Sequence, residues 1–152
     1  MGLGVDFQTA VRQLAEDVGI ELEPESKEAQ AKRKKAKELA EANSYTLVFF
    51  EHQLWGPGGE EARRYLSERG IPEDFAKKRR LGFGGQTQDL LGYLDAKRIR
   101  RDLGASAGFL TADGNRGLFD QRVIFPIFDA QQNLVGFGGR RLGDGDSPKY
   151  VN

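Results

Sequence analysis

Hydrophobic and polar residues recur at helical spacing through the first two thirds of the chain. Apolar residues at this spacing from Phe7 to Val18 predict a short amphipathic helix, with Asp6 as its N-cap and Gly19 as its C-cap. Residues 25–54 contain neither glycine nor proline, and they begin highly charged and end hydrophobic. This pattern predicts a long helix that becomes buried towards its end. The following sequence WGPGG, at 55–59, predicts that the helix stops there.

Three shorter helices are predicted next. EEARRYLSERG ends at Gly70, and IPEDFAKKRR has Pro72 and acidic residues at its start and basic residues at its end, as a helix dipole favours. LGFGG then interrupts the chain. The sequence DLLGYLDAKRI supplies an apolar helix face through its leucines, although Gly92 weakens that helix.

The pattern changes after Gly108. RVIFPIF is a run of branched and aromatic residues, DAQQN is a polar turn, and LVGFGGR is a second extended segment, which together predict a β-hairpin. Pro126 cannot donate a ladder hydrogen bond, so the first strand should lie at an edge or leave the sheet near that point. The predicted fold class is α+β, with helices in the first two thirds and a small antiparallel sheet in the last third.

Composition excludes several kinds of chemistry. The 23 Lys and Arg residues balance the 23 Asp and Glu residues, so overall charge gives no reason to expect nucleic acid. The absence of cysteine excludes a disulfide framework, a thiolate zinc site and a thiol nucleophile within these residues. The sequence has no export signal and no apolar stretch of the roughly 20 residues that a membrane span needs, so we expect a soluble, cytoplasmic protein.

Several candidate sites have simpler structural interpretations. GFGG occurs at 82–85 and 136–139, but neither copy has the context of a phosphate-binding loop, and both are interpreted as turns or as places of close backbone approach. Asp144 and Asp146 are interpreted as part of a turn, His52 as a structural or exposed residue, and the basic stretch 32–37 as a solvated helix face.

The carboxy-terminal residues carry the remaining chemical signal. Basic, aromatic and amide side chains gather around the glycine-rich hairpin, and such groups can contact phosphates, bases and sugars. A solvated hairpin end would have a similar composition, so the residues alone leave both interpretations open. The cluster consists of Arg140, Arg141, Lys149, Tyr150 and Asn152.

The segment RVIFPIFDAQQNLVGFGGRRLGDGDSPKYVN, from Arg122 to Asn152, closely resembles bacterial DNA primases of the DnaG type in the order and spacing of its Phe-Pro-Ile, Gly-Phe-Gly-Gly-Arg and Pro-Lys-Tyr elements. YLSERGI and LGFGG resemble further elements of that family, and DFQTAVRQLAEDVGIEL resembles the helix that follows the family's zinc-binding domain. The resemblance implies the amino-terminal subdomain of the RNA polymerase core. Residues 1–55 would be the helical segment after the zinc-binding domain, and 56–152 the mixed α/β subdomain.

The resemblance also implies a function. A primase synthesises short RNA primers on single-stranded DNA for replication, using ribonucleoside triphosphates, and the family has a basic template groove beside a metal-binding Toprim subdomain. The resemblance places no catalytic residue and no metal ligand in this chain, whereas Mg²⁺ and Zn²⁺ are expected for the full-length enzyme. Replicative helicase and single-strand binding protein are expected to bind through other parts of the protein, at the replisome. The positions that match template- or nucleotide-binding residues are Arg69, Arg122, Arg140, Lys149, Tyr150 and Asn152.

The chain departs from the family before Arg122. Two further arginines are usual there, whereas this sequence has Leu118, Asp120 and Gln121, and Arg116 is a possible substitute. We expect the chain alone to bind rather than to polymerise, because the family's catalytic acids belong downstream. Two alternatives remain: a non-catalytic scaffolding module of a replication protein, and a small phosphate-ligand enzyme that uses GFGG.

Overall fold

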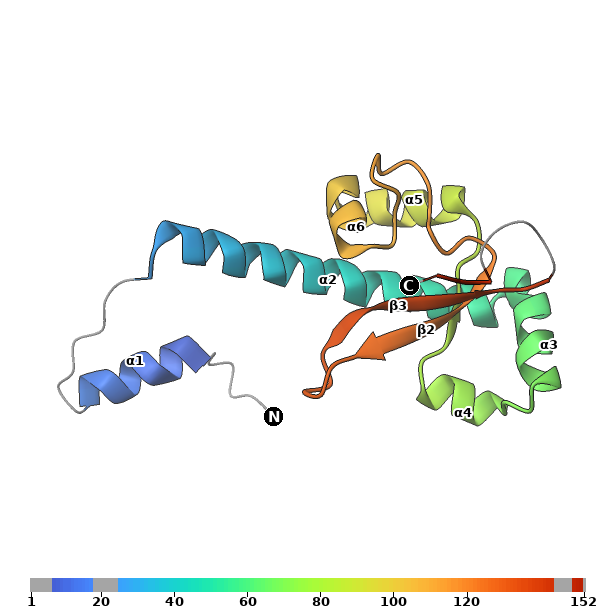
Figure 1. Ribbon diagram of the computed structural model, residues 1–152, viewed down its shortest axis with the longest axis horizontal. Coiled ribbons are helices and arrows are strands. Elements are labelled where there is room, and N and C mark those ends of the chain that lie inside the picture. Colours follow the sequence, from blue (N-terminus) through green and yellow to red (C-terminus); the bar gives the residue numbers. More distant parts are fainter. Residues whose placement is uncertain (1–6, 18–24, 144–148, 152) are drawn as a thin grey trace. The chain divides into compact units, whose positions relative to one another are not determined.

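The computed structural model describes residues 7–17, 25–143 and 149–151 (Figure 1). By compactness it divides into two units, residues 1–34 and 35–152. Helix α1, Phe7–Asp17, belongs to the first unit, and the exposed fractions of Val11 and Leu14 are 36% and 64%. The predicted caps of this helix, Asp6 and Gly19, lie outside the described residues.

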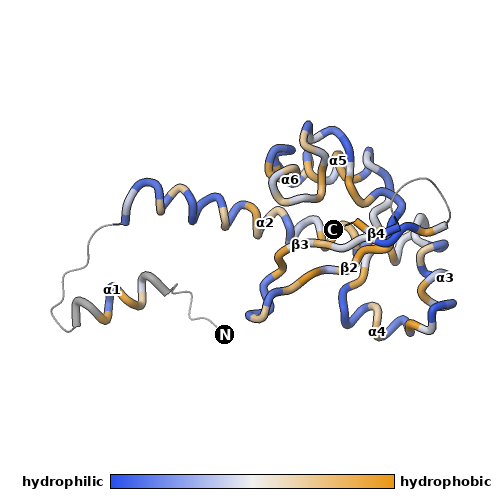
Figure 2. The backbone as a smooth tube through the Cα atoms, viewed as in Figure 1, coloured by the Kyte–Doolittle hydropathy of each residue, from blue (hydrophilic) through white to orange (hydrophobic). Residues whose placement is uncertain are grey.

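The long predicted helix is confirmed as α2, Lys27–Trp55, which continues from the first unit into the second. Its charged first half is exposed, and its hydrophobic second half is buried along one side from Ala42 onwards, while Tyr45 and Val48 stay exposed; Figure 2 shows the change in hydropathy along the helix. The break at WGPGG is the 3₁₀ turn η1, Pro57–Gly59. The remaining helices are α3, Glu60–Glu68; α4, Glu73–Lys78; α5, Thr87–Ala96; and α6, Arg101–Ala107.

Four antiparallel strands form one sheet in the order β1-β2-β3-β4. The predicted hairpin is confirmed as β2, Arg122–Phe128, and β3, Leu134–Arg141. The short strands at its two sides are β1, Gly82–Phe83, and β4, Tyr150–Val151. β1 pairs only with Val123 and Ile124, so Pro126 lies beyond it, at the edge position that its missing N–H requires.

The hairpin turn is held by Asp129. Its carboxylate accepts hydrogen bonds from the backbone amides of Gln131 and Asn133, each at 2.9 Å. The bond from the Asn133 amide is the main cause that holds the pKa of Asp129 below its usual value. The turn therefore keeps a charged carboxylate at neutral pH and fixes the β2–β3 register.

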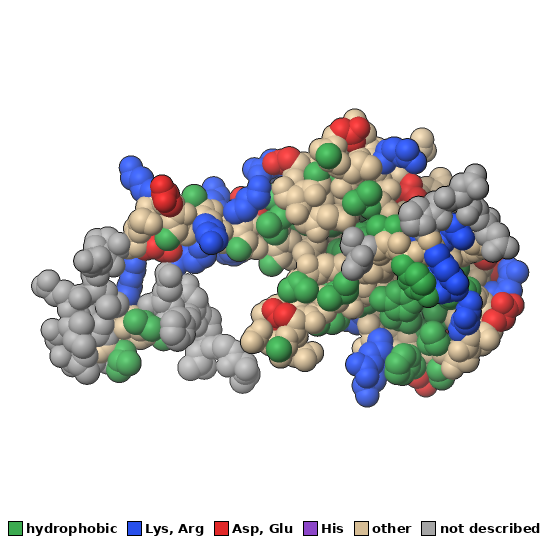
Figure 3. Space-filling view, in the orientation of Figure 1, with side chains coloured by type: hydrophobic (Ala, Val, Ile, Leu, Met, Phe, Trp, Pro, Cys, Tyr) green, Lys and Arg blue, Asp and Glu red, His purple; other side chains and the backbone are tan. Residues whose placement is uncertain are grey.

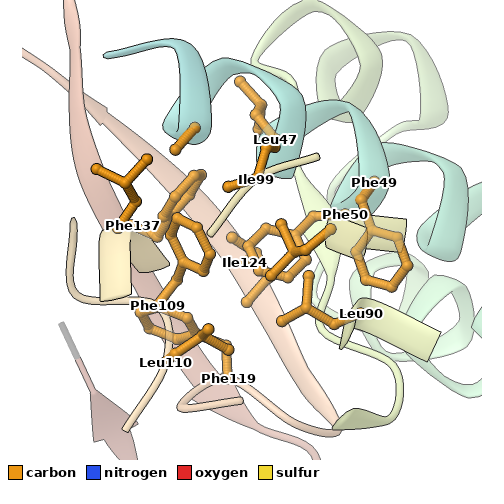
Figure 4. Packing of buried hydrophobic residues seen from close by; sticks show 13 residues of the cluster. Leu47, Phe49, Phe50, Leu90, Ile99, Phe109, Leu110, Phe119, Ile124 and Phe137 are labelled. Atoms are coloured by element: carbon orange, nitrogen blue, oxygen red, sulfur yellow. The ribbon is translucent and has the colours of Figure 1, made fainter. Parts of the chain in front are cut away.

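Hydrophobic residues pack on both faces of the sheet. On one face, Ile124 and Phe137 pack with α2, α5 and α6, and the centre of this cluster is Phe50, whose ring lies 5.2 Å from that of Phe137 and 6.2 Å from that of Phe119 (Figure 4). On the other face, Val123 and Leu142 pack with α3, α4 and the end of α2. The sheet is thus the middle layer of the second unit.

The first GFGG copy is a place of close approach, as predicted. A Cβ at Gly82 would lie 2.6 Å from the Cβ of Phe50, and a Cβ at Gly84 would overlap the carbonyl of Phe119. In the second copy, Gly139 is equally restricted, because its Cβ would lie 2.6 Å from the Phe119 ring. Packing inside the fold therefore explains these three glycines without a phosphate ligand. No described helix is long and apolar enough to cross a membrane.

Candidate nucleic-acid interface

Arg140 lies where β3 meets the short strand β4. It pairs directly with Tyr150 in the sheet, and one of its guanidinium N–H groups donates to the Tyr150 hydroxyl. The guanidinium carbon also lies 5.0 Å from the centroid of the Tyr150 ring and 5.4 Å from that of Tyr65. Both distances are within the range of cation–π attraction, so two aromatic rings fix the position of this cation.

Helix α3 contributes the other half of the site. Tyr65 and Arg69 are four residues apart, which places them on one side of the helix end, and the Arg69 guanidinium lies 5.1 Å from the Tyr65 ring centroid. Arg63 fixes α3 against α2, because it donates to the carbonyls of Leu54 and Gly56 at 2.6 and 2.7 Å. One tyrosine ring thus contacts two guanidinium groups from different elements. We call Tyr65, Arg69, Arg140 and Tyr150 the Arg–Tyr cluster.

The Arg–Tyr cluster has a positive charge that the described part of the chain leaves uncompensated. The ion pairs found there use other residues, and none involves Arg69 or Arg140. Tyr150 is 61% exposed, and Arg69 is exposed as well. Figure 3 shows Lys and Arg side chains beside hydrophobic ones on this part of the second unit. Fixed cations beside an accessible ring are suited to a phosphate and a base.

The other predicted site residues have different positions. Lys149 is exposed and precedes Tyr150, so it borders the Arg–Tyr cluster, while its carbonyl accepts a hydrogen bond from the Arg122 guanidinium at 3.2 Å. Arg122 is only 6% exposed. Burial, and then the positive charge of Arg141, lowers its pKa below the usual arginine value. It lies beneath the surface and supports the segment that carries Lys149. Asn152 lies outside the described residues.

Sequence reasoning did not select Tyr65 as a site residue. The segment YLSER contains the signal, since a tyrosine and an arginine four residues apart in a helix are neighbours. What the sequence could not show is that Arg140, 75 positions after Tyr65, approaches the same ring.

The residues that depart from the family pattern stabilise a loop. Asp120 accepts a hydrogen bond from the Thr87 hydroxyl, and the side-chain amide of Gln121 donates to the carbonyl of Gly85 at 3.0 Å. Leu118 is 37% exposed. Arg116 is also exposed and makes no described contact with the Arg–Tyr cluster. Compensation by Arg116 stays a prediction.

A metal centre does not fit the described residues. Within 7–17, 25–143 and 149–151, no three His, Cys, Asp or Glu side chains gather to hold an ion. Asp144 and Asp146 lie outside these ranges.

Comparison with known proteins identifies the family of the chain. The model of the family described as DNA primase catalytic core, N-terminal domain, matches residues 49–152. The DNA primase of Deinococcus radiodurans is 35% identical over 153 residues, which are 97% of this chain and 25% of that protein. That of Myxococcus xanthus is 32% identical over 155 residues, with coverages of 99% and 25%. The chain belongs to the DNA primase family and spans about a quarter of the length of these relatives.

A solved structure also has this fold. The DnaG primase catalytic domain bound to single-stranded DNA aligns at a TM-score of 0.70 and 31% identity, over 79% of this chain and 40% of its own. The α+β fold predicted from the sequence is thus confirmed, as is the family.

Proposed function

We propose that this chain is part of a DNA primase that synthesises short RNA primers on single-stranded DNA, and that its Arg–Tyr cluster binds the template or the incoming nucleotide. The observation that carries the proposal is the position of Tyr65 between Arg69 and Arg140, with Tyr150 exposed beside them. The two guanidinium groups come from α3 and β3, so the fold brings together residues that are distant in the sequence.

This arrangement favours binding without sequence readout. Arg69 and Arg140 can contact phosphate oxygens, and the exposed ring of Tyr150 can stack on any base, because every base has a π-face. Lys149 adds a mobile cation at the border of the Arg–Tyr cluster. Arg122 acts indirectly, by holding the backbone carbonyl of Lys149. Asn152 is retained as a proposed contact on the family resemblance alone.

In this proposal the chain supplies binding, and the metal-dependent chemistry belongs to another part of the protein. Magnesium bound by the metal-binding subdomain would neutralise the triphosphate, and a zinc module would precede this segment. Ribonucleoside triphosphates are the proposed second ligand. Helicase and single-strand binding protein would contact other parts of the enzyme. Residues 1–55 would form the segment after the zinc module, and 56–152 the mixed subdomain.

The salt dependence of DNA binding tests the proposal. Fluorescence anisotropy of a labelled oligothymidylate should show binding to the chain at low salt. Two or three phosphate contacts predict that affinity falls about 25- to 125-fold over a roughly tenfold rise in salt, since each contact to a single strand contributes a slope of about −0.7. A scaffolding module with an apolar docking face predicts little salt dependence. Absence of binding at low salt would contradict the proposed function.

A further inference from the structure

An open pocket lies between α4 and the outer half of β2, apart from the Arg–Tyr cluster. Its volume is about 460 Å³, which is in the range of sites for small ligands. Ile71 and Phe75 line it from the α3–α4 side, and Phe125 and Phe128 line it from β2. β1 does not extend along this part of β2, so the pocket occupies the free edge of the strand.

Aromatic rings in this pocket remain accessible. Phe75 is 46% exposed and Phe128 is 39% exposed, although both are large hydrophobic side chains. The Arg79 guanidinium lies 5.5 Å from the Phe75 ring centroid. This repeats the pairing of a cation with a ring that Arg140 and Tyr150 make in the Arg–Tyr cluster.

The pocket also has positive charge without compensation. Four basic residues in a row, 77–80, span the end of α4 and the turn after it, and the outer two form ion pairs: Lys77 with Glu73 and Arg80 with Glu51, each at 2.7 Å. Lys78 and Arg79 line the pocket, and no carboxylate of the described chain pairs with either. The nearby carboxylate of Asp129 is occupied by the amides of the hairpin turn.

One face of the sheet connects the pocket to the Arg–Tyr cluster. Val123 pairs with Arg140 and Phe125 with Gly138, and alternate residues of a strand share a face. At roughly 3.4 Å per residue, Phe125 is only about 7 Å along β2 from the position opposite Arg140. A short single strand can therefore reach both places.

Two glycines keep this face open. A Cβ at Gly138 would come no closer than 3.9 Å to any atom, and a Cβ at Gly136 would have no neighbour within 4 Å. Neither has a positive φ. Glycine weakens a strand, and internal packing does not require it at these two positions, in contrast to Gly139. The absent side chains leave room along β3 for a ligand.

We propose that the pocket is a second nucleotide subsite, which receives a base on Phe75 and Phe128 and the adjacent phosphate on Lys78 and Arg79. The occupant is a further nucleotide of the same single strand that contacts the Arg–Tyr cluster. The inference rests on the proposed function, because the strand in question is the one that the Arg–Tyr cluster is proposed to bind. Cations beside exposed rings favour a nucleotide over an acidic peptide, which has no base to stack.

Binding of two oligothymidylates, about 2 and about 12 nucleotides long, separates the two sites, because Phe128 is roughly 17 Å along β2 from the position opposite Arg140 and a dinucleotide cannot place a base at both. Lys78→Glu is expected to weaken the longer oligonucleotide about fivefold to tenfold and to leave the shorter within about twofold. Phe128→Ala should act in the same direction. Lys97→Glu, which makes the same change in charge beside Tyr45 and Tyr93, is the control. Equal effects of Lys78→Glu and Lys97→Glu would overturn the subsite.

Gly138→Ala offers an independent measurement, because the fold has space for a Cβ there. It should reduce binding of the longer oligonucleotide with an unchanged melting temperature, and unaltered binding would contradict the proposed path. If the unmodified chain binds the shorter oligonucleotide and gains nothing from the longer one, the subsite fails and the proposed function stands. If the chain binds neither oligonucleotide, both the subsite and the proposed function are contradicted.

Two further ligands test which kind of molecule the pocket binds. Thymidine triphosphate that binds in a Lys78-dependent manner and competes with the longer oligonucleotide would support a nucleotide pocket filled from solution. A peptide of alternating Glu and Phe that binds in a Lys78-dependent manner without displacing either oligonucleotide would assign the pocket to a protein partner and overturn the inference.

Discussion

Replacing Arg140 with alanine is expected to weaken binding of a single-stranded oligonucleotide about 30-fold, which corresponds to about 2 kcal/mol. The substitution removes one phosphate contact and also the cation that holds the rings of Tyr65 and Tyr150 in place. Stacking on an aromatic side chain contributes about 1–3 kcal/mol per base, so misplaced rings add to the loss. Anisotropy at low salt measures the change, and the slope of affinity against salt should become shallower.

Two other variants serve as controls for Arg140→Ala. Arg140→Lys keeps the charge but loses the planar group that stacks on the rings, so it should fall between the unmodified chain and the alanine variant. Arg101→Ala removes an arginine that pairs with Asp95 in another part of the second unit, and it should have little effect. If Arg140→Ala and Arg101→Ala weaken binding equally, the Arg–Tyr cluster has no special role.

Phe50→Ala is expected to lower the free energy of unfolding by about 3–5 kcal/mol, because a large buried ring is replaced by a cavity. Phe50 is 1% exposed, and it packs edge-to-face on Phe49, Phe119 and Phe137, which come from α2, the loop before β2, and β3. Urea denaturation followed by circular dichroism measures the loss.

Phe75→Ala is the matched control for stability. It removes the same phenyl ring, but Phe75 lies on α4 and is 46% exposed. Its cost should remain below about 1 kcal/mol. Comparable losses for the two variants would show that the packing around Phe50 is not the centre of the core.

The sequence was most informative where a long pattern had one physical explanation. Residues 25–54 contain no helix breaker, and the helix extends over Lys27–Trp55. The β2–β3 hairpin was predictable because branched and aromatic runs flank a polar turn, and Pro126 lies where β2 has passed its partner β1. These elements are determined by residues close together in the chain.

Short elements were missed because distant contacts define them. β1 and β4 have two residues each, and each is a strand only because the hairpin supplies partners. Helix α6 contains Gly104, a poor helix former, whose Cβ would lie 2.5 Å from the side chain of Leu110. Packing therefore overrides local preference there.

The candidate site was predictable only in part, for the same reason. Residue types and family resemblance selected Arg69 and Arg140, but the Tyr65 ring that both contact was not selected. Arg122 was selected with the exposed cations, whereas the fold buries its side chain. A sequence contains the chemistry of each side chain but not its distance to residues from other elements.

An NMR titration of the chain with an unlabelled oligothymidylate locates the DNA-binding surface. If the Arg–Tyr cluster binds the strand, the amide shifts that change most belong to residues 65–69, 138–141 and 149–151, around the cluster. Largest changes on α5 and α6, with those three segments unaffected, would contradict it.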